Sequence, residues 1–193
     1  MSSGNKAGNP LVMKAIGMIH SPFDEAAGTP IQPIYGRGVE GTVMLDEAFV
    51  SALDDIEGFD RIWLIYWMDR TGLFKPRVMP YRDTVEHGLF ATRSPNRPNP
   101  IGMSAVRLLR REGATLFVVD MDILDGTPLL DIKPYVPDFD CHANSRAGDG
   151  SIRQEWTGGW QMEGFTTSIL MEMICDRDRD SRICHIPLSA PRA

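Results

Sequence analysis

Residues 101–123 read IGMSAVRLLRREGATLFVVDMDI, and this stretch predicts the class of fold. Two β-rich runs, Ile101 to Leu109 and Ala114 to Ile123, flank the polar turn Arg-Arg-Glu-Gly, which is the pattern of a β-hairpin. Antiparallel strands can be joined by such short turns, whereas parallel strands need long crossover helices, for which the chain has too few helical patterns. The hairpin therefore predicts a mainly β protein.

Further strands are predicted on both sides of this hairpin. Lys14 to His20 and Val39 to Leu45 alternate between apolar and other residues, and Leu129 to Tyr135 forms a last apolar run before Pro137. Arg61 to Met68 is an almost continuous apolar run, so we expect a strand that is covered on both faces. Several short strands with Gly and Pro turns predict a small β-barrel or sandwich.

One early helix is expected among these strands. Asp46 is placed to cap a helix that runs to Asp55, because Phe49, Leu53 and Ile56 recur at helical spacing and Gly58 follows. Beyond Asp140 the composition changes to Gly, Ser and Asn, then to an apolar run and a run of alternating charges. The 193 residues therefore suggest a flexible N-terminus (1–13), one β-barrel domain (14–140) and a C-terminal appendage (141–193).

The composition is that of an ordinary soluble protein. Hydrophobic residues make up 42% and charged residues 24% of the chain, and no apolar run is long enough to cross a membrane. Met1 to Pro10 is polar and differs from a signal peptide, so a cytoplasmic location is expected. The histidines and cysteines lack the spacing of a zinc site or of a disulfide framework, so neither is expected: His20, His87, His142, His185, Cys141, Cys175 and Cys184.

The stretch from Phe90 to Gly102, FATRSPNRPNPIG, predicts a stiff loop. Its three prolines fall within six residues, fix backbone angles and remove hydrogen-bond donors, which excludes a helix or a central strand. The loop carries Arg93 and Arg97, whose planar guanidinium groups suit carboxylates and phosphates. A plain surface connection is the alternative, but a rigid loop with two cations favours an anion-binding loop.

The distribution of charge agrees with an anionic partner. The chain has a net charge of -6, yet Arg70 to Arg111 holds nine Lys or Arg against Asp83 and Glu86, a local charge of +7. A basic segment of this kind is suited to the phosphate backbone of a nucleic acid. The alternative is a set of solvated charges on several faces, which the sequence leaves open.

A dinucleotide fingerprint occurs in the chain but is rejected. Gly36 to Gly41 reads GRGVEG and matches G-x-G-x-x-G letter for letter. The fingerprint requires a strand before the glycines and a helix after them, whereas here no apolar strand precedes and a strand-like run follows. A Rossmann cofactor site is therefore excluded. The hydrolase elbow, the P-loop and the His-Glu-x-x-His motif are also missing from the sequence.

The motifs together resemble a known family. The stretch Ala91 to Gly102, together with Asp125-Gly126-Thr127-Pro128 and Asp131-Ile132-Lys133-Pro134-Tyr135, closely resembles the TsaA-like/TrmO family of tRNA methyltransferases. Ile16-Gly17 to Ser21-Pro22 and Pro30-Ile31-Gln32 fit the N-terminal pattern of that family, and the resemblance covers Ala15 to Asp140. It implies a small β-barrel that forms homodimers and binds S-adenosylmethionine outside any Rossmann fold.

The resemblance also implies a reaction and a set of site residues. The reaction is N6-methylation of threonylcarbamoyladenosine beside the tRNA anticodon, with no metal and no membrane. The residues implied for the cofactor are Pro30, Ile31, Gln32, Asp69, Arg70, Arg93, Met103, Asp122, Ile123, Leu124 and Asp125. Those expected to bind the RNA substrate are Arg97, Asn99, Lys133 and Tyr135.

Three questions stay open at the level of sequence. Family members often have His-Gln where this chain has Asp69-Arg70, so the resemblance supports the same cofactor more directly than it supports the same acceptor. Asp69 and Tyr135 are possible proton acceptors, but no catalytic base is assigned. The alternative functions are a non-catalytic module that binds S-adenosylmethionine or RNA, and a methyltransferase with another acceptor.

Overall fold

The structure is a computed structural model, and it describes residues 12–80, 83–142 and 145. The chain divides into two compact units. One contains the residues up to Val78 and Glu86–Val136, and the other contains Met79–Val85 and the residues from Pro137 onward. In the second unit, the short helix α1 (Pro137–Asp140) ends with the amide of Cys141 donating to the carbonyl of Pro137 at 3.2 Å.

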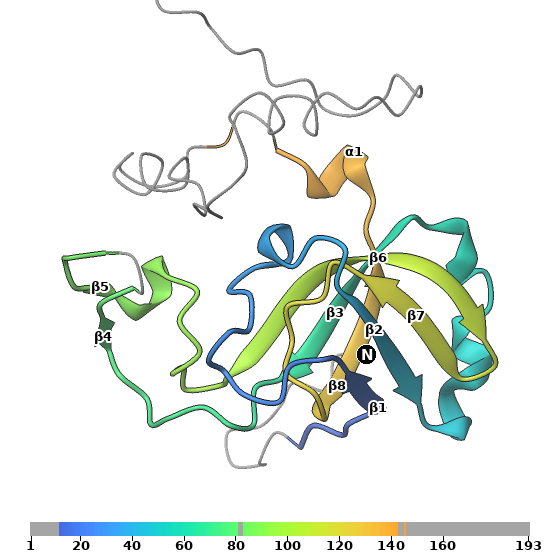
Figure 1. Cartoon of the computed structure of the whole chain (residues 1–193), viewed down its shortest axis with the longest axis horizontal. Coiled ribbons are helices and arrows are strands. Elements are labelled where there is room, and N and C mark those ends of the chain that lie inside the picture. The colour runs from blue at the N-terminus through green and yellow to red at the C-terminus, as the bar shows by residue number, and fades with distance from the viewer. Residues whose placement is uncertain (1–11, 81–82, 143–144, 146–193) are drawn as a thin grey trace, which may run out of the picture. The chain divides into compact units, whose positions relative to one another are not determined.

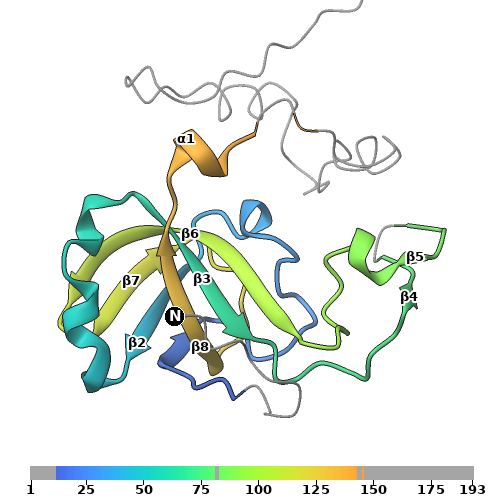
Figure 2. The same ribbon diagram turned by 180° about the vertical axis from the view of Figure 1, so that it is seen from behind.

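The first unit is built around a closed antiparallel barrel (Figure 1). Its strands follow one another around the barrel in the order β1-β2-β7-β6-β3-β8, and β8 pairs with β1 to close it (Figure 2). Their bounds are β1 Gly17–His20, β2 Glu40–Leu45, β3 Arg61–Trp67, β6 Ile101–Glu112, β7 Thr115–Val119 and β8 Thr127–Pro134. A separate two-stranded sheet pairs β4 (Arg77–Val78) with β5 (His87–Gly88). The predicted β-barrel and the predicted hairpin, now β6–β7, are confirmed.

The barrel interior is filled by the alternate residues of each strand. Side chains of this set are fully buried and pack into one core: Ile19, Val43, Ile62, Leu64, Val106, Leu116, Val118 and Leu129. Because side chains alternate across a strand, their neighbours in sequence point outward. Arg61–Trp67 therefore buries only its inner face, and Trp63, Ile65 and Trp67 are half-buried. The expectation that this strand is covered on both faces was wrong, because a strand of a single barrel turns only one face to the core.

The predicted early helix exists in a different form. The segment is a 3-10 helix, η2 (Glu47–Leu53), and it is followed by a second one, η3 (Ile56–Gly58). The Asp46 side chain makes no capping hydrogen bond, and Asp55 has a left-handed backbone with φ of 66°. Instead, the guanidinium of Arg111 donates to the carbonyl oxygens of Val50 and Leu53 at 3.2 and 3.1 Å. A side chain from a distant strand thus satisfies carbonyl groups at the end of the helix.

The glycines of the rejected fingerprint have structural reasons of their own. After η1 (Pro33–Tyr35), a Cβ atom on Gly36 would lie 2.2 Å from the carbonyl oxygen of Met121, so only glycine fits there. Gly38 has φ of 78°, in the left-handed region that favours glycine. β2 follows directly and no helix opens after the glycines, which agrees with the exclusion of a dinucleotide site. In the described part of the chain, no helix is long and apolar enough to cross a membrane.

Candidate functional site

One end of the barrel carries most of the residues that the sequence predicts for a cofactor. Because the strands are antiparallel around the barrel, β1, β3 and β7 end there, and β2, β6 and β8 begin there. The segments 21–39, 68–78 with 86–100, and 120–126 therefore leave the barrel at the same end, which we call the loop end (Figure 1). Pro30 to Gln32, Asp69-Arg70, Arg93 and Asp122 to Asp125 all belong to these segments, and Met103 is the third residue of β6.

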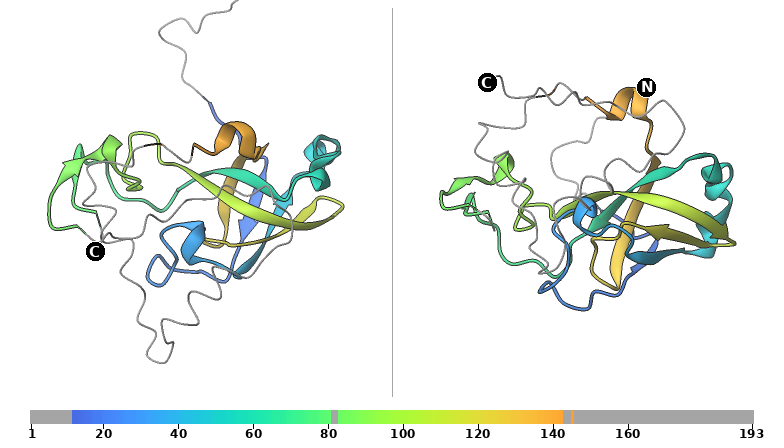
Figure 3. Two further views of the ribbon diagram at one scale, coloured as in Figure 1. Left: turned by 90° about the horizontal axis from the view of Figure 1, so that it is seen from above. Right: turned by 45° about the horizontal axis from the view of Figure 1, so that its top comes forward.

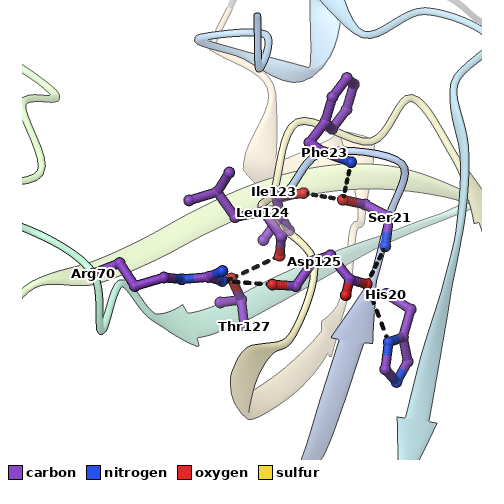
Figure 4. Close-up of polar contacts among 8 residues, drawn as sticks. All are labelled: His20, Ser21, Phe23, Arg70, Ile123, Leu124, Asp125 and Thr127. Carbon is purple, nitrogen blue, oxygen red and sulfur yellow. Dashed lines mark hydrogen bonds and ion pairs between the residues drawn. The ribbon is translucent and has the colours of Figure 1, made fainter. Parts of the chain in front are cut away.

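The 122–127 loop is held in place by side chains from two other segments (Figure 4). The Ser21 hydroxyl donates to the carbonyl of Ile123 at 2.6 Å, and the Ser21 amide donates to the Asp125 carboxylate at 3.1 Å. The Nδ1 atom of His20 lies 3.1 Å from the same carboxylate. Arg70 donates to the carbonyl oxygen of Asp125 at 2.6 Å and to the Thr127 hydroxyl at 3.1 Å. Arg70 and Asp125, both predicted cofactor residues, thus shape the loop.

These contacts also act on the charge of Asp125. The hydrogen bond from the Ser21 amide, and after it the bond from His20, hold the pKa of the Asp125 carboxyl below its ordinary value. Because both contacts favour the ionised form, Asp125 is a carboxylate at neutral pH. Arg70 lies 3.4 Å from the carboxylate of Asp69, so the Asp69-Arg70 pair is joined to the same loop.

Asp122, at the start of this loop, is different because part of its carboxylate has no partner. Its Oδ1 atom is buried and has no hydrogen-bond partner among the described residues. Burial raises the pKa of Asp122 from 3.8 to about 6, and a hydrogen bond from Ser104 and the charge of Arg93 moderate the rise. A buried acceptor without a donor is costly, so it needs a structural reason or a ligand.

Asp122 belongs to a small polar cluster inside the loop end. The hydroxyl groups of Tyr66 and Ser104 lie 3.1 Å apart, and both residues are buried. Burial, and after it the Asp122 charge, raises the pKa of Tyr66 to about 12, so its phenol is protonated at neutral pH. The Tyr66 ring packs so closely on Gly102 that a Cβ atom there would lie 2.1 Å from the ring. This packing fixes the Tyr66 hydroxyl beside Ser104.

Arg93 connects two of the predicted cofactor segments. Its guanidinium donates to the side-chain carbonyl of Gln32 at 2.5 Å and remains exposed. Ile31 and Met103 are apolar but are 50% and 51% exposed. The loop end therefore offers a cation, a buried anion and apolar surface within a set of connected segments.

A crevice of about 290 Å³ opens next to Arg93, on the outer face of β3 and β6. Its walls are formed by Pro33, Ile34, Arg37, Arg61, Trp63, Arg93, Met103, Ala105 and Asp120. Arg61 donates to the carboxylate of Asp120 at 3.0 Å, and the Gly38 amide donates to the other oxygen of that carboxylate at 3.2 Å. The sequence reasoning missed Arg37, Arg61 and Asp120 because they lie far apart along the chain.

The residues expected to bind RNA are not gathered at one place. Arg97 turns back on its own loop, donating to the carbonyl of Thr92 at 2.9 Å and lying 5.4 Å from the Phe90 ring centre. Asn99 is exposed in the same loop. Lys133 and Tyr135 lie at the other end of β8: Lys133 pairs with Asp131 at 2.7 Å, and the Tyr135 ring lies 5.5 Å from that of Trp63.

The basic segment does not form a single patch. Arg110 and Arg111 lie at the β6–β7 turn, which Figure 1 and Figure 3 show at the opposite end of the barrel from the 90–100 loop. Arg110 pairs with Glu112 at 2.8 Å, and Arg111 pairs with Asp54 at 3.3 Å. The alternative of charges spread over several faces is therefore correct for this part of the segment. Among the described residues, no group of three or more His, Cys, Asp or Glu could hold a metal ion.

These features define a class of protein: a small antiparallel β-barrel with its candidate ligand residues in the loops at one end and, among the described residues, no glycine-rich turn that leads into a helix. The comparisons with known proteins give the family. Residues 18–141 match the model of the tRNA-methyltransferase O N-terminal domain. The chain therefore belongs to the tRNA-methyltransferase O family.

The similar proteins come from archaea, bacteria and mammals. A probable S-adenosyl-L-methionine-binding protein of Pyrococcus abyssi is 53% identical over 135 residues, which are 70% of this chain and 73% of that protein. The tRNA (adenine(37)-N6)-methyltransferase of Escherichia coli is 37% identical over 63% of this chain and 56% of its own length. The crystal structure of TrmO from Pseudomonas aeruginosa has a TM-score of 0.63 at 39% identity, covering 72% of this chain and 62% of that one. The chain thus matches a little over half of the length of the enzyme from Escherichia coli.

Proposed function

We propose that this protein is an S-adenosylmethionine-dependent methyltransferase that acts on N6 of threonylcarbamoyladenosine next to the tRNA anticodon. The names of the relatives from Pyrococcus abyssi and Escherichia coli support the cofactor and the tRNA acceptor. The observation that carries the proposal is the buried, unpartnered Oδ1 atom of Asp122 in the same loop end as the exposed Arg93.

The side chains of the loop end fit the chemical groups of this cofactor. S-adenosylmethionine has a carboxylate that suits Arg93, and it has ammonium, sulfonium and ribose hydroxyl groups that suit the Asp122 carboxylate, whose Oδ1 atom has no partner among the described residues. Exposed Ile31 and Met103 offer apolar surface for an adenine ring. When bound, the cofactor supplies an electrophilic methyl group. The protein must then hold the acceptor nitrogen in line with that group, and positioning of this kind can supply most of the acceleration.

The acceptor nitrogen must also lose a proton, and neither candidate acceptor has a clear advantage. Asp69 is an exposed carboxylate beside Arg70, and the Tyr135 ring is tilted against Trp63 at the far end of β8. Asp69 belongs to a segment of the loop end, but its carboxylate already lies 3.4 Å from the Arg70 guanidinium. The catalytic base therefore stays unassigned.

The proposal includes a homodimer in the cytoplasm. Exposed apolar side chains support a second copy at the loop end: Phe90 is 78% exposed, Ile31 50% and Met103 51%. Family resemblance favours a dimer in which a second copy completes the site. The cytoplasmic location follows from the proposed tRNA substrate. The division into a catalytic barrel (14–140) and an appendage (141–193) also stays a prediction, since almost all of the appendage lies outside the described residues.

Methyl transfer is tested with labelled S-adenosylmethionine and total tRNA from cells that contain or lack threonylcarbamoyladenosine. We expect label in N6-methylated threonylcarbamoyladenosine, identified by nucleoside mass spectrometry, only when the precursor is present. Calorimetry tests the site: Arg93→Ala should weaken cofactor binding by about 1 to 3 kcal/mol, the usual value for a charged hydrogen bond. Arg77→Ala is the matched control, because Arg77 is exposed and pairs with Glu86 in the separate two-stranded sheet. Equal binding by both variants would remove Arg93 from the site.

A second candidate function is cofactor or RNA binding without methyl transfer. It is favoured by the Asp69-Arg70 pair, whose two side chains are joined to each other and to the 122–127 loop. Binding of the cofactor without labelling of any RNA would support this second function and would contradict the first.

A further inference from the structure

The crevice beside Arg93 extends beyond the residues that have a role in the function proposed above. Its walls include Arg37, Arg61 and Trp63, none of which is a residue expected to contact the cofactor. We propose that this crevice binds one nucleotide of the RNA substrate, with the base against the Trp63 indole and the phosphate against Arg37 and Arg61. The identity of the RNA rests on the proposed function, whereas the preference for a nucleotide rests on the crevice itself.

The charge of the crevice favours an anion. Three arginines, at 37, 61 and 93, face one acid, Asp120. The two Asp120 oxygens are already engaged by Arg61 and by the Gly38 amide, so this carboxylate is neutralised and does not repel a phosphate as a free anion would. No ion pair or hydrogen bond of the Arg37 guanidinium occurs within the part of the chain that the structure describes. Arg37 is thus available for a phosphate.

The aromatic surface of the crevice favours a base. Trp63 lies on the outer face of β3 and lines the crevice, and its cross-strand partner on β6 is Ala105, a small residue that also lines it. On the other side Tyr135 supports the Trp63 ring at 5.5 Å between ring centres. A base that stacks on an aromatic side chain gains affinity without regard to sequence. The volume of about 290 Å³ is close to the lower limit for small-molecule sites, so it suits one nucleotide.

The wall opposite the strands is fixed before any ligand binds. Gly36 packs against the Met121 carbonyl, and the amides of Tyr35 and Gly36 donate to Gln32 and Pro33 at 2.9 and 3.0 Å. This holds η1 beside β6 (Figure 3). A site that is already formed loses less entropy on binding. Arg93 and Met103 line both this crevice and the loop end, so a nucleotide held here lies next to the expected cofactor residues.

The first test uses adenosine 5′-monophosphate as the probe, with the full chain saturated by S-adenosylhomocysteine to occupy any cofactor site. We expect calorimetry to show that the monophosphate binds at least five-fold more tightly than adenosine. Arg37→Ala should remove most of this preference, and Trp63→Leu should weaken both ligands by about five-fold or more, the lower part of the range for base stacking. Trp63→Phe should restore most of the loss, because it keeps an aromatic face. Arg107→Ala, which removes an exposed arginine of β6 outside the crevice, is the control.

A second measurement separates this inference from the proposed function. With tRNA as the acceptor, Arg37→Ala should raise KM several-fold with a smaller effect on kcat. It should also reduce the salt dependence of RNA binding by the amount expected for the loss of about one phosphate contact. If tRNA is methylated but Arg37→Ala and Trp63→Leu behave like Arg107→Ala in both assays, the crevice is not a nucleotide site. If tRNA is not methylated but the monophosphate shows the expected pattern, the proposed function fails and the nucleotide site stands.

Discussion

Replacing Asp122 by asparagine tests two effects of the buried carboxylate separately. One is its cost to the stability of the folded protein, and the other is its contribution to cofactor binding. The pKa of Asp122 is raised from 3.8 to about 6 by burial, so the folded protein holds this proton more tightly than the unfolded chain does. The stabilisation from the bound proton is complete below pH 3.8 and is lost as the pH rises through 6. At 1.36 kcal/mol per pKa unit, the ionised side chain costs the folded state about 3 kcal/mol at pH 8.

Asparagine has nearly the same shape but does not ionise, so Asp122→Asn should escape this cost. The free energy of unfolding of Asp122→Asn, relative to that of the unsubstituted protein, should rise with pH by about 3 kcal/mol in total. About 2 kcal/mol of this rise should occur between pH 4 and pH 6. Urea unfolding at pH 4, 5, 6, 7 and 8 measures the difference in the free energy of unfolding. Asp24→Asn is the control: it removes an exposed carboxylate in the 21–39 segment and so measures the effect on stability of losing one negative charge at the surface.

The same substitution should weaken binding of the cofactor. A ligand that donates a hydrogen bond to the ionised carboxylate offsets its cost, so Asp122→Asn should lose about 1.5 to 3 kcal/mol of binding free energy at pH 8. Calorimetry with S-adenosylmethionine measures this loss. A difference in the free energy of unfolding that does not vary with pH would refute the conclusion that burial raises the pKa of Asp122. Unchanged affinity would refute its role in binding, even if the protein became more stable.

Three further substitutions test the surroundings of the loop end. Gly102→Ala should destabilise the protein by about 1 to 3 kcal/mol in urea unfolding, because the added methyl group overlaps the Tyr66 ring; no loss would mean that the ring moves freely. Arg70→Ala should reduce cofactor affinity about five-fold in calorimetry, since the carbonyl of Asp125 loses its 2.6 Å donor and the loop loosens; unchanged affinity would show that the loop holds without Arg70. Asp125→Asn should lower stability at pH 7 by less than about 1 kcal/mol, a small value because the carboxylate is half-exposed. The pKa of Asp125 is lowered, so its contribution is present above the ordinary pKa and is lost as the pH falls; the difference should therefore shrink toward pH 3, and a difference that grows in acid would contradict this.

The sequence by itself determined the local features of this protein. The alternation of the hairpin predicted β6 and β7, because side-chain period follows directly from strand geometry. Three prolines predicted a stiff loop from Phe90 to Gly102, because a proline ring fixes φ wherever it occurs. The middle of this stretch lies outside helices and strands, but the stretch begins in the 3-10 helix η4 (Leu89–Ala91) and ends in β6. The absence of a helix after Gly41 excluded the dinucleotide site on local grounds. The family motifs also implied which segments contact the cofactor, and the structure brings these segments to one end of the barrel.

The tertiary structure decided what depends on residues far apart in the chain. The helical spacing after Asp46 could not predict a 3-10 helix whose last carbonyls are bound by Arg111, 58 residues after Leu53. The Arg61–Asp120 pair of the crevice joins residues 59 apart. The unpartnered Oδ1 atom of Asp122 lies in a loop that leaves the barrel, and its burial is a property of the whole fold. Local propensity is read from neighbours in sequence, whereas burial and charge pairing are set by neighbours in space, so only the closed barrel could show the polar cluster and the crevice.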